Sequence, residues 1–257
     1  MVFGRPLALI LSAGPLFGGI QLEIREGRPM VDGVYVNGHG PYRFLLDTGT
    51  NVNVIEKGLA KRIGMTTTFH TDLESAAGKT RIGGSDANEV ELGPEKVSGQ
   101  KFLYSGLEAI HSHFPDVRGV LGQWFLFGFD YMLDMRGKQL EFGKHSLNGK
   151  RSQVRMLNGR TAVSTSLGDL ILDSGAGRLV LFGVDHDRGD RRYLRTVSGS
   201  EIVRVVSSTL IIEGRNIWRG DAVAVPGRGE PGVAGLMPLS LFKTIYVCNS
   251  EGYVVFE

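Results

Sequence analysis

The chain has 257 residues, of which 42% are hydrophobic and 22% are charged, and this length can bury the core of one large or two small globular domains. A formal net charge of only +2 gives no indication of a nucleic-acid surface. The single cysteine, Cys248, rules out an internal disulfide and is expected to pack in the core, and no apolar segment is long enough for a membrane span.

Residues 1–18 allow two interpretations. A short basic start from Met1 to Arg5 precedes the apolar run Leu7 to Leu11 and a few small residues, which is the order found in a secretory signal. The alternative is an N-terminal strand that pairs into a sheet. The first interpretation is the favoured one and predicts an exported protein, periplasmic or secreted, whereas the second leaves the protein in the cytoplasm.

The first half of the chain is predicted to consist mainly of strands. Residues 20–24 and 30–36 alternate in polarity, Asn37-Gly38 is a hairpin signal, and a strand over 42–46 ends at Asp47. A helix is expected over 56–63, with Gly64 as its stop. Further strands are predicted at 52–55, 90–92, 101–104, 131–134 and 139–142, with a hairpin tip at 76–79 and an aromatic helix or turn at 123–129.

After a polar, basic linker at 143–152, the order of elements repeats. Strands at 154–156 and 162–166 flank the turn Asn158-Gly159, an apolar run leads to Asp173, and a second hairpin tip is expected at 196–200. Gly232-Val233-Ala234-Gly235 is aligned with Gly119-Val120-Leu121-Gly122. The repeat predicts two similar lobes related by an approximate twofold axis, an N-terminal lobe over 19–147 and a C-terminal lobe over 148–257.

Two short motifs occupy corresponding places in the repeat. Leu45-Leu46-Asp47-Thr48-Gly49 and Ile171-Leu172-Asp173-Ser174-Gly175 each carry one carboxylate from an apolar strand into a turn. An Asp-x-Gly sequence also occurs in ordinary turns. Because a lone buried carboxylate is costly, the doubled pattern favours two carboxyl groups that face each other and share a proton, which is the layout of an acid–base pair.

These motifs resemble those of the aspartic proteases, the superfamily of the homodimeric retropepsins and the two-lobed pepsins. Its mark is Asp-Thr/Ser-Gly after two apolar residues, with a later apolar-apolar-Gly turn, here Val120-Leu121-Gly122 and Val233-Ala234-Gly235. The resemblance covers about residues 20 to 257, and the stretch from Asn37 to Asp47 is most similar to small bacterial retropepsin-like enzymes. The chain lacks cysteine pairs and a Tyr in the first tip, so pepsin-like preferences do not transfer.

The resemblance implies an all-β, two-lobed acid-protease fold with the active site in the cleft between two β-barrel-like lobes. It implies an aspartic endopeptidase that acts on extended peptides without metal or cofactor. The divergence of the two halves and the short linker between them predict that one chain forms one active site, as a monomer. Asp47 and Asp173 would be catalytic and would hold a water. Supporting roles are implied for Thr48, Gly49, Ser174, Gly175, Gly122 and Gly235. Ala77-Gly78 and Ser198-Gly199 would form flaps that cover the substrate.

Two alternatives remain open, a catalytically inactive peptide-binding protein of the same fold and a processing protease of narrow specificity. Other conspicuous segments are given structural interpretations. His111 to His113 and Asp185 to Arg192 are predicted to be surface loops rather than metal sites, Trp124 to Phe127 to be lobe core, and Gly83-Gly84-Ser85 to be a turn. Neither the substrate side-chain preference nor the identity of the protonated Asp follows from the sequence.

Overall fold

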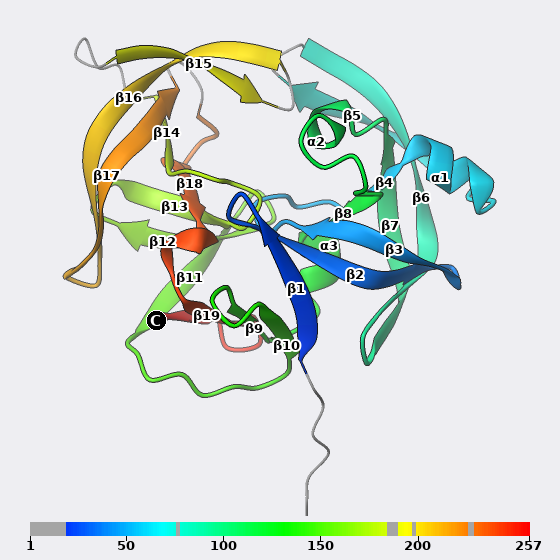
Figure 1. Ribbon diagram of the computed structural model, residues 1–257, viewed down its shortest axis with the longest axis horizontal. Coiled ribbons are helices and arrows are strands. Elements are labelled where there is room, and N and C mark those ends of the chain that lie inside the picture. The colour runs from blue at the N-terminus through cyan, green and yellow to red at the C-terminus, as the bar shows by residue number, and fades with distance from the viewer. Residues whose placement is uncertain (1–18, 76–77, 184–189, 197–198, 226–228) are drawn as a thin grey trace, which may run out of the picture.

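The computed structural model describes residues 19–75, 78–183, 190–196, 199–225 and 229–257, so the predicted leader at 1–18 lies outside the described residues. Within them the chain forms twenty strands and four short helical segments. Figure 1 shows strands β12 to β18 gathered in one lobe and β2 to β8 in the other. The predicted all-β, two-lobed fold class is confirmed.

The first lobe is organised around the strand that ends at Asp47. This strand, β3 (His39–Leu46), pairs antiparallel with β2 (Arg28–Val36) and parallel with β8 (Gly119–Leu121). Phe44, Leu45 and Leu46 are all buried, as expected for a strand with neighbours on both sides and cover on both faces. The lobe also contains β4 (Val54–Glu56), α1 (Lys57–Arg62), β5 (Phe69–Ser75), β6 (Gly78–Leu92), β7 (Glu95–Ser105), α2 (Glu108–His111) and α3 (Gln123–Leu126).

The second lobe repeats this arrangement around Asp173. Strand β13 (Gly168–Asp173) pairs antiparallel with β12 (Arg160–Thr165) and parallel with β18 (Gly235–Pro238). The sequence analysis did not identify β14, β16 or β17. The other elements of the lobe are β14 (Val180–Phe182), β15 (Asp190–Thr196), β16 (Gly199–Ile212), β17 (Arg215–Val225) and the 3₁₀ helix η1 (Leu239–Leu241).

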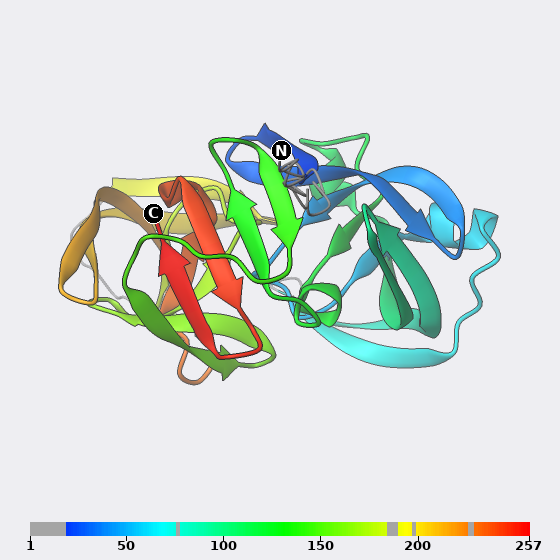
Figure 2. The same ribbon diagram turned by 90° about the horizontal axis from the view of Figure 1, so that it is seen from below.

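A further sheet joins the two lobes. Its strands lie in the order β1, β10, β9, β19, β20, β11, and the β9–β19 pair connects the first half of the chain to the second. Figure 2, which views the molecule from below, shows β9 and β10 (green) beside β19 and β20 (red). The predicted boundary near residue 147 falls in the connection from β10 to β11. The strands are β1 (Ile20–Arg25), β9 (Tyr131–Asp134), β10 (Gln139–Phe142), β11 (Arg151–Leu157), β19 (Thr244–Cys248) and β20 (Tyr253–Phe256).

The predicted turns are confirmed at positions where the backbone conformation requires a particular residue type. Asn37 and Gly38 form the predicted hairpin turn with φ of 52° and 73°, and Gly64 follows α1 with φ of 74°. Cys248 is 1% exposed, as expected for core packing. No helix in the described part of the chain is both long and apolar enough to cross a membrane.

Four local predictions were wrong. Gly83 to Ser85 lie inside β6 rather than in a turn, because this strand runs from Gly78 to Leu92 and pairs first with β5 and then with β7. His111 is the last residue of α2, not part of a loop. Phe127 is 51% exposed, although Phe125 and Leu126 are core residues as predicted. The charged loop is shorter than predicted, because Asp190 to Arg192 belong to β15, while the rest of it lies outside the described residues.

Candidate active site

Asp47 and Asp173 lie at the ends of two buried strands and meet where the lobes join. Asp47 follows β3 directly, and Asp173 is the last residue of β13. Each carboxyl group affects the pKa of the other, so the two lie within interaction distance. Asp173 is only 7% exposed, whereas Asp47 is half-buried. The fold therefore brings together two carboxyl groups that are 126 residues apart in the sequence.

Thr48 and Ser174 connect the two turns by four reciprocal hydrogen bonds. The backbone N–H of Thr48 donates to Ser174 Oγ over 2.9 Å, and the N–H of Ser174 donates to Thr48 Oγ1 over 3.0 Å. Thr48 Oγ1 in turn donates to the carbonyl of Leu172 (2.8 Å), and Ser174 Oγ to that of Leu46 (2.6 Å). Both side chains are buried, so each hydroxyl is used as donor and as acceptor away from solvent.

Thr48→Val is expected to lower the free energy of unfolding by about 2–5 kcal/mol. The substitution keeps the shape but leaves the Leu172 carbonyl and the Ser174 N–H buried without partners, at about 1–3 kcal/mol each. Urea denaturation measures the change. The matched control is Thr165→Val, because the Thr165 hydroxyl also donates once and accepts once, but close to solvent. An equal loss in both variants would contradict the prediction.

Two glycines leave room for the carboxyl groups. A Cβ on Gly49 would lie 2.2 Å from Cγ of Asp173, and a Cβ on Gly175 would lie 2.6 Å from Cγ of Asp47. Each turn also supports its own carboxyl group, because the N–H of Gly49 donates to Asp47 Oδ1 and the N–H of Ala176 donates to Asp173 Oδ1, both over 2.9 Å. The glycine of each lobe is thus packed against the carboxyl group of the other.

Burial is the largest influence on the pKa of both carboxyl groups. It raises the pKa of Asp173 well above its ordinary value, and the nearby charge of Asp47 raises it further. Burial also raises the pKa of Asp47, but there the N–H groups of Gly49, Gly175 and Thr50 and the neighbouring carboxyl group of Asp173 act in the opposite direction. Because the two carboxyl groups interact, the pair titrates as a unit.

The strand register corrects one predicted equivalence between the lobes. Leu46 lies opposite Leu121, and Leu172 lies opposite Met237. Gly122 therefore corresponds to Pro238, and Gly235 corresponds to Gly119 instead. The backbone of Gly235 packs against the carbonyl of Val180 and not behind the catalytic turn. A Cβ added to Gly235 would lie 2.0 Å from that carbonyl oxygen. The predicted alignment matched the two lobes by the spacing of their glycines, whereas the strand pairing shows which residues are equivalent.

The exchange of Gly122 for Pro238 is matched by a second exchange. The N–H of Gly122 donates to Asn53 Oδ1 over 3.0 Å. Proline has no N–H to satisfy. The residue that corresponds to Asn53 is Leu179, because the carbonyls of both accept equivalent bonds from the β7 and β17 strands. The second lobe therefore lacks both the N–H donor of Gly122 and the side-chain acceptor of Asn53, and Pro238 and Leu179 leave no hydrogen-bonding group unsatisfied in their place.

Asn53 and Gln123 are site residues that the sequence analysis did not identify. Gln123 is 3% exposed and donates from Nε2 to the carbonyl of Thr48 over 2.8 Å, so it fixes the first catalytic turn from behind. The available signal was an amide in an apolar run, Val52-Asn53-Val54, because a buried polar side chain requires a partner.

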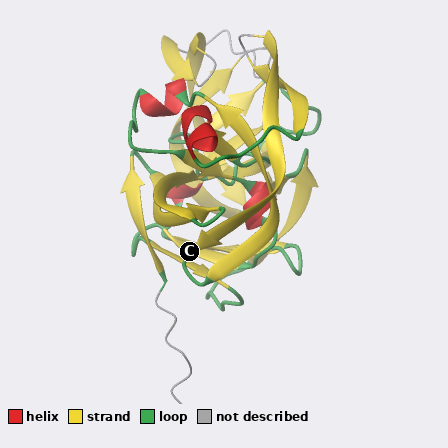
Figure 3. Ribbon diagram, turned by 90° about the vertical axis from the view of Figure 1, so that its right-hand side faces the viewer, coloured by secondary structure: helices red, strands yellow, loops and turns green. Residues whose placement is uncertain are grey.

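The predicted flap residues are only partly described. Ala77 and Ser198 lie outside the described residues, while Gly78 and Gly199 are the first residues of β6 and β16. Strands β5 and β6 of one lobe and β15 and β16 of the other rise to the same end of the molecule (Figures 1 and 3). The two hairpins are therefore placed alike in the two lobes.

Candidate metal ligands do not cluster in the part of the chain that the structure describes. No group of three or more His, Cys, Asp or Glu side chains there could hold a metal ion. His111 Nε2 lies 2.8 Å from the carbonyl of Val117, and His113 lies 3.7 Å from Glu26. These contacts give the two histidines structural partners of their own.

The family match among the comparisons with known proteins lies in the first lobe. The family described as Aspartyl protease matches residues 33–125, a segment that contains Asp47 and Gly122 but not Asp173. A comparison with curated proteins gave no match. Among solved structures, the chain is similar to a retropepsin-like aspartic protease from Rickettsia conorii, with 19% identity, 43% of this chain and 78% of that chain covered, and a TM-score of 0.34. The family match confirms the resemblance to the aspartic protease superfamily.

Proposed function

We propose that this chain is an aspartic endopeptidase that hydrolyses extended peptides with a water held between Asp47 and Asp173. The observation that carries the proposal is a pair of carboxyl groups, one from each lobe, that meet where the two turns are hydrogen-bonded to each other and where the glycine of each turn packs against the carboxyl group of the other. The Aspartyl protease match over the first lobe supports a peptide-hydrolase function. The second lobe supplies the second Asp in the same structural setting.

The two carboxyl groups have different roles in the proposed mechanism. Ionised Asp47 takes a proton from the water, whose oxygen attacks the scissile carbonyl carbon, while protonated Asp173 donates its proton to the carbonyl oxygen. As the tetrahedral intermediate collapses, the peptide nitrogen leaves with the proton held by Asp47, and a proton returns to Asp173 from the intermediate. We assign the acid role to Asp173 because it is the less exposed of the two and because burial raises its pKa well above the ordinary value.

Activity is expected to be greatest at weakly acidic pH, about 4 to 6, because catalysis needs one proton on the pair. At lower pH the base, Asp47, becomes protonated, and at higher pH the acid, Asp173, loses its proton. Hydrolysis of denatured casein measured across about pH 3 to 10 tests this expectation. A maximum above pH 8 would contradict it, and loss of activity in a chelator that zinc restores would contradict the metal-free mechanism.

Two alternatives are distinguished by a second measurement. A processing protease of narrow specificity would leave casein intact but would still bind the transition-state analogue pepstatin, because both carboxyl groups are in place. An inactive peptide-binding protein would cleave neither casein nor any member of a peptide library. The presence of both Asp-Thr/Ser-Gly turns favours an active enzyme over this last alternative.

We propose that one chain forms one active site. The halves differ at corresponding positions, Gly122 against Pro238 and Asn53 against Leu179, and the sheet that joins the lobes pairs β9 with β19 of the same chain. Co-refolded Asp47→Asn and Asp173→Asn proteins should therefore remain inactive, because every molecule has lost one carboxyl group. Recovery of activity that rises with protein concentration would instead show that sites are shared between chains.

A further inference from the structure

Arg28 reaches from the first lobe to the catalytic turn of the second. Its Nε–H donates to the carbonyl oxygen of Gly175 over 2.7 Å. The guanidinium is held from its own lobe by Glu26, whose Oε2 lies 3.3 Å from Nη1, and by the ring of Phe114, whose centre lies 5.9 Å from Cζ. The side chain is 26% exposed, so part of its charge is shielded from water.

The carbonyl that Arg28 contacts belongs to the peptide group that supports Asp173. Gly175 C=O and Ala176 N–H are the two ends of that group, and the N–H donates to Asp173 Oδ1 over 2.9 Å. A hydrogen bond to the carbonyl polarises the peptide and strengthens the bond made by its N–H. A cation as donor increases this effect, and a stronger bond to a carboxyl group favours its ionised form.

The first catalytic turn has no equivalent support from the second lobe's arginine. Arg28 begins β2 after the turn Glu26-Gly27, and Arg160 begins β12 after the turn Asn158-Gly159, so the two arginines correspond. Arg160 instead forms an ion pair with Glu230, which also accepts a hydrogen bond from Asn158. Its charge is thus directed to a carboxylate of its own lobe.

Glu230 occupies the position of Phe114, which explains the difference between the two arginines. The N–H of Val117 donates to the carbonyl of Phe114, and the N–H of Val233 donates to that of Glu230, so the two residues begin equivalent turns before β8 and β18. An aromatic ring leaves the guanidinium free to donate elsewhere, whereas a carboxylate binds it directly. With Phe114 beside it, Arg28 donates to Gly175, whereas Arg160 is bound by Glu230 at the corresponding position.

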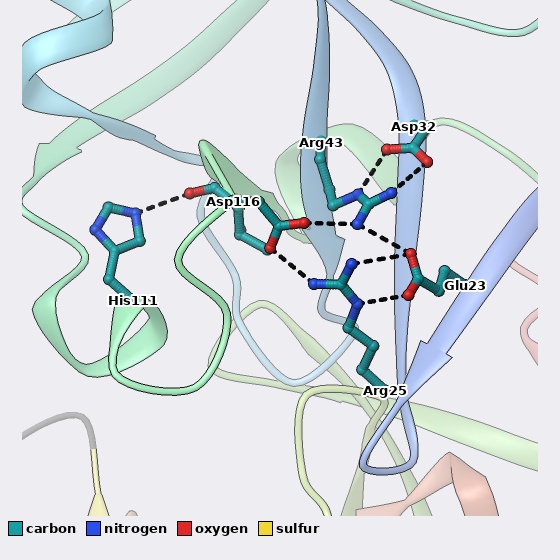
Figure 4. Close-up of polar contacts among 7 residues, drawn as sticks. Glu23, Arg25, Asp32, Arg43, His111 and Asp116 are labelled. Atoms are coloured by element: carbon teal, nitrogen blue, oxygen red, sulfur yellow. Dashed lines mark hydrogen bonds and ion pairs between the residues drawn. The ribbon is translucent and has the colours of Figure 1, made fainter.

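The segment that carries Phe114 is fixed by a charged network (Figure 4). Asp116 binds Arg25 Nη1 over 2.7 Å through Oδ1 and Arg43 Nη1 over 2.6 Å through Oδ2. Glu23 and Asp32 complete the network on strands β1 and β2. Because Asp116 is two residues from Phe114, the network holds the ring under Arg28 against the sheet that contains β1 to β3.

We propose that Arg28 is a positioning residue for the dyad, which holds the second catalytic turn and, through the Gly175–Ala176 peptide, weakens the hold of Asp173 on its proton. This inference rests on the proposed function for its kinetic consequence. The charged groups that face the relay are Asp47 opposite Asp173, Glu26 beside Arg28, and His113 beyond Glu26. Arg160 has no such effect on Asp47.

The test compares the wild type with Arg28→Met, Arg28→Lys and Arg160→Met in two measurements. The first is the pH profile of kcat/KM. Without Arg28, Asp173 should keep its proton to higher pH, so the alkaline limb of the profile should shift to higher pH by roughly half to one unit. Because the second catalytic turn is then less well held, kcat should fall about tenfold. Arg28→Lys, which retains a charge, should shift the limb less, and it serves as the test variant if Arg28→Met does not fold. Arg160→Met should leave the limb in place.

The second measurement follows the dyad by NMR of ¹³C-carboxyl-labelled Asp and needs no activity. The later ionisation of the pair should move upward in Arg28→Met, to a smaller extent in Arg28→Lys, and not in Arg160→Met. If the wild type hydrolyses no peptide, the proposed function fails but this titration still tests the relay. Unchanged titration in both Arg28 variants, or an equal shift in Arg160→Met, would overturn the inference.

Discussion

Asp47→Asn and Asp173→Asn should each lower kcat by about a thousandfold or more while the protein stays folded. Each substitution removes one half of the acid–base pair, and proton transfer by a positioned group contributes about 10²–10⁴ to a rate. The loss from either variant should be similar, because the carboxyl groups act as a unit. Steady-state kinetics at the optimal pH of the wild type measures the effect.

The matched control for this prediction is Asp169→Asn, four residues before Asp173 on the same strand. Asp169 is paired with Arg155 over 3.0 Å and accepts a hydrogen bond from Ser164, at the surface and away from the dyad. We expect this variant to keep near wild-type turnover. Full activity in Asp47→Asn or Asp173→Asn would refute the assignment of the dyad, whatever the result for Asp169.

The same variants should change the pH dependence of stability in a defined direction. The pKa of Asp173 is raised in the folded state, so its contribution to the free energy of unfolding is fully present below the pKa of the unfolded chain, about 3.9. That contribution is lost as the pH rises through the folded pKa. Relative to the wild type, Asp173→Asn should therefore become more stable as the pH rises from acid to neutral, as urea denaturation at both pH values can measure.

Gly49→Ala should be the most damaging substitution that leaves both carboxyl groups in the sequence. The added Cβ would lie 2.2 Å from Cγ of Asp173, so the dyad must move apart or the turn must shift. A displacement of about 1 Å can cost about a hundredfold in rate, and overpacking typically costs about 1–3 kcal/mol of stability. Kinetics and thermal unfolding of the purified variant test both effects.

The control is Gly58→Ala, the same substitution in helix α1. There a Cβ would be 3.4 Å from the nearest atom, which is the end of the Glu56 side chain, and alanine favours a helix by about 1 kcal/mol over glycine. This variant should be slightly more stable and fully active. If Gly49→Ala behaved like Gly58→Ala, the close contact between Gly49 and Asp173 would not hold in solution.

The sequence allowed a good prediction of those parts of the fold that depend on local backbone requirements. Turns such as Asn37-Gly38 and the buried strand before Asp47 are marked by residue types that few other conformations favour. The doubled Asp-Thr/Ser-Gly pattern placed both carboxyl groups because it repeats a whole strand and turn. These features require no knowledge of what packs beside them.

The remaining features depend on partners that are distant in sequence. The equivalence of Gly235 with Gly119 rather than Gly122 follows from parallel pairing with β13, which no local spacing reveals. Asn53 matters because the Gly122 N–H comes to it across the lobe, and Leu179 can replace it only because Pro238 has no N–H. Likewise, nothing near Arg28 in the sequence indicates that it contacts Gly175.

The sheet that joins the lobes also has a consequence for how the protein is made. During synthesis β1, β9 and β10 leave the ribosome long before β19 and β20, so the edge of β9 that will pair with β19 has no neighbour until then. An open strand edge invites association with other chains, and a chaperone could shield it during this interval. The same order delays assembly of the pair of Asp47 and Asp173, because the sheet that joins the two lobes is completed only when β19 and β20 have been made.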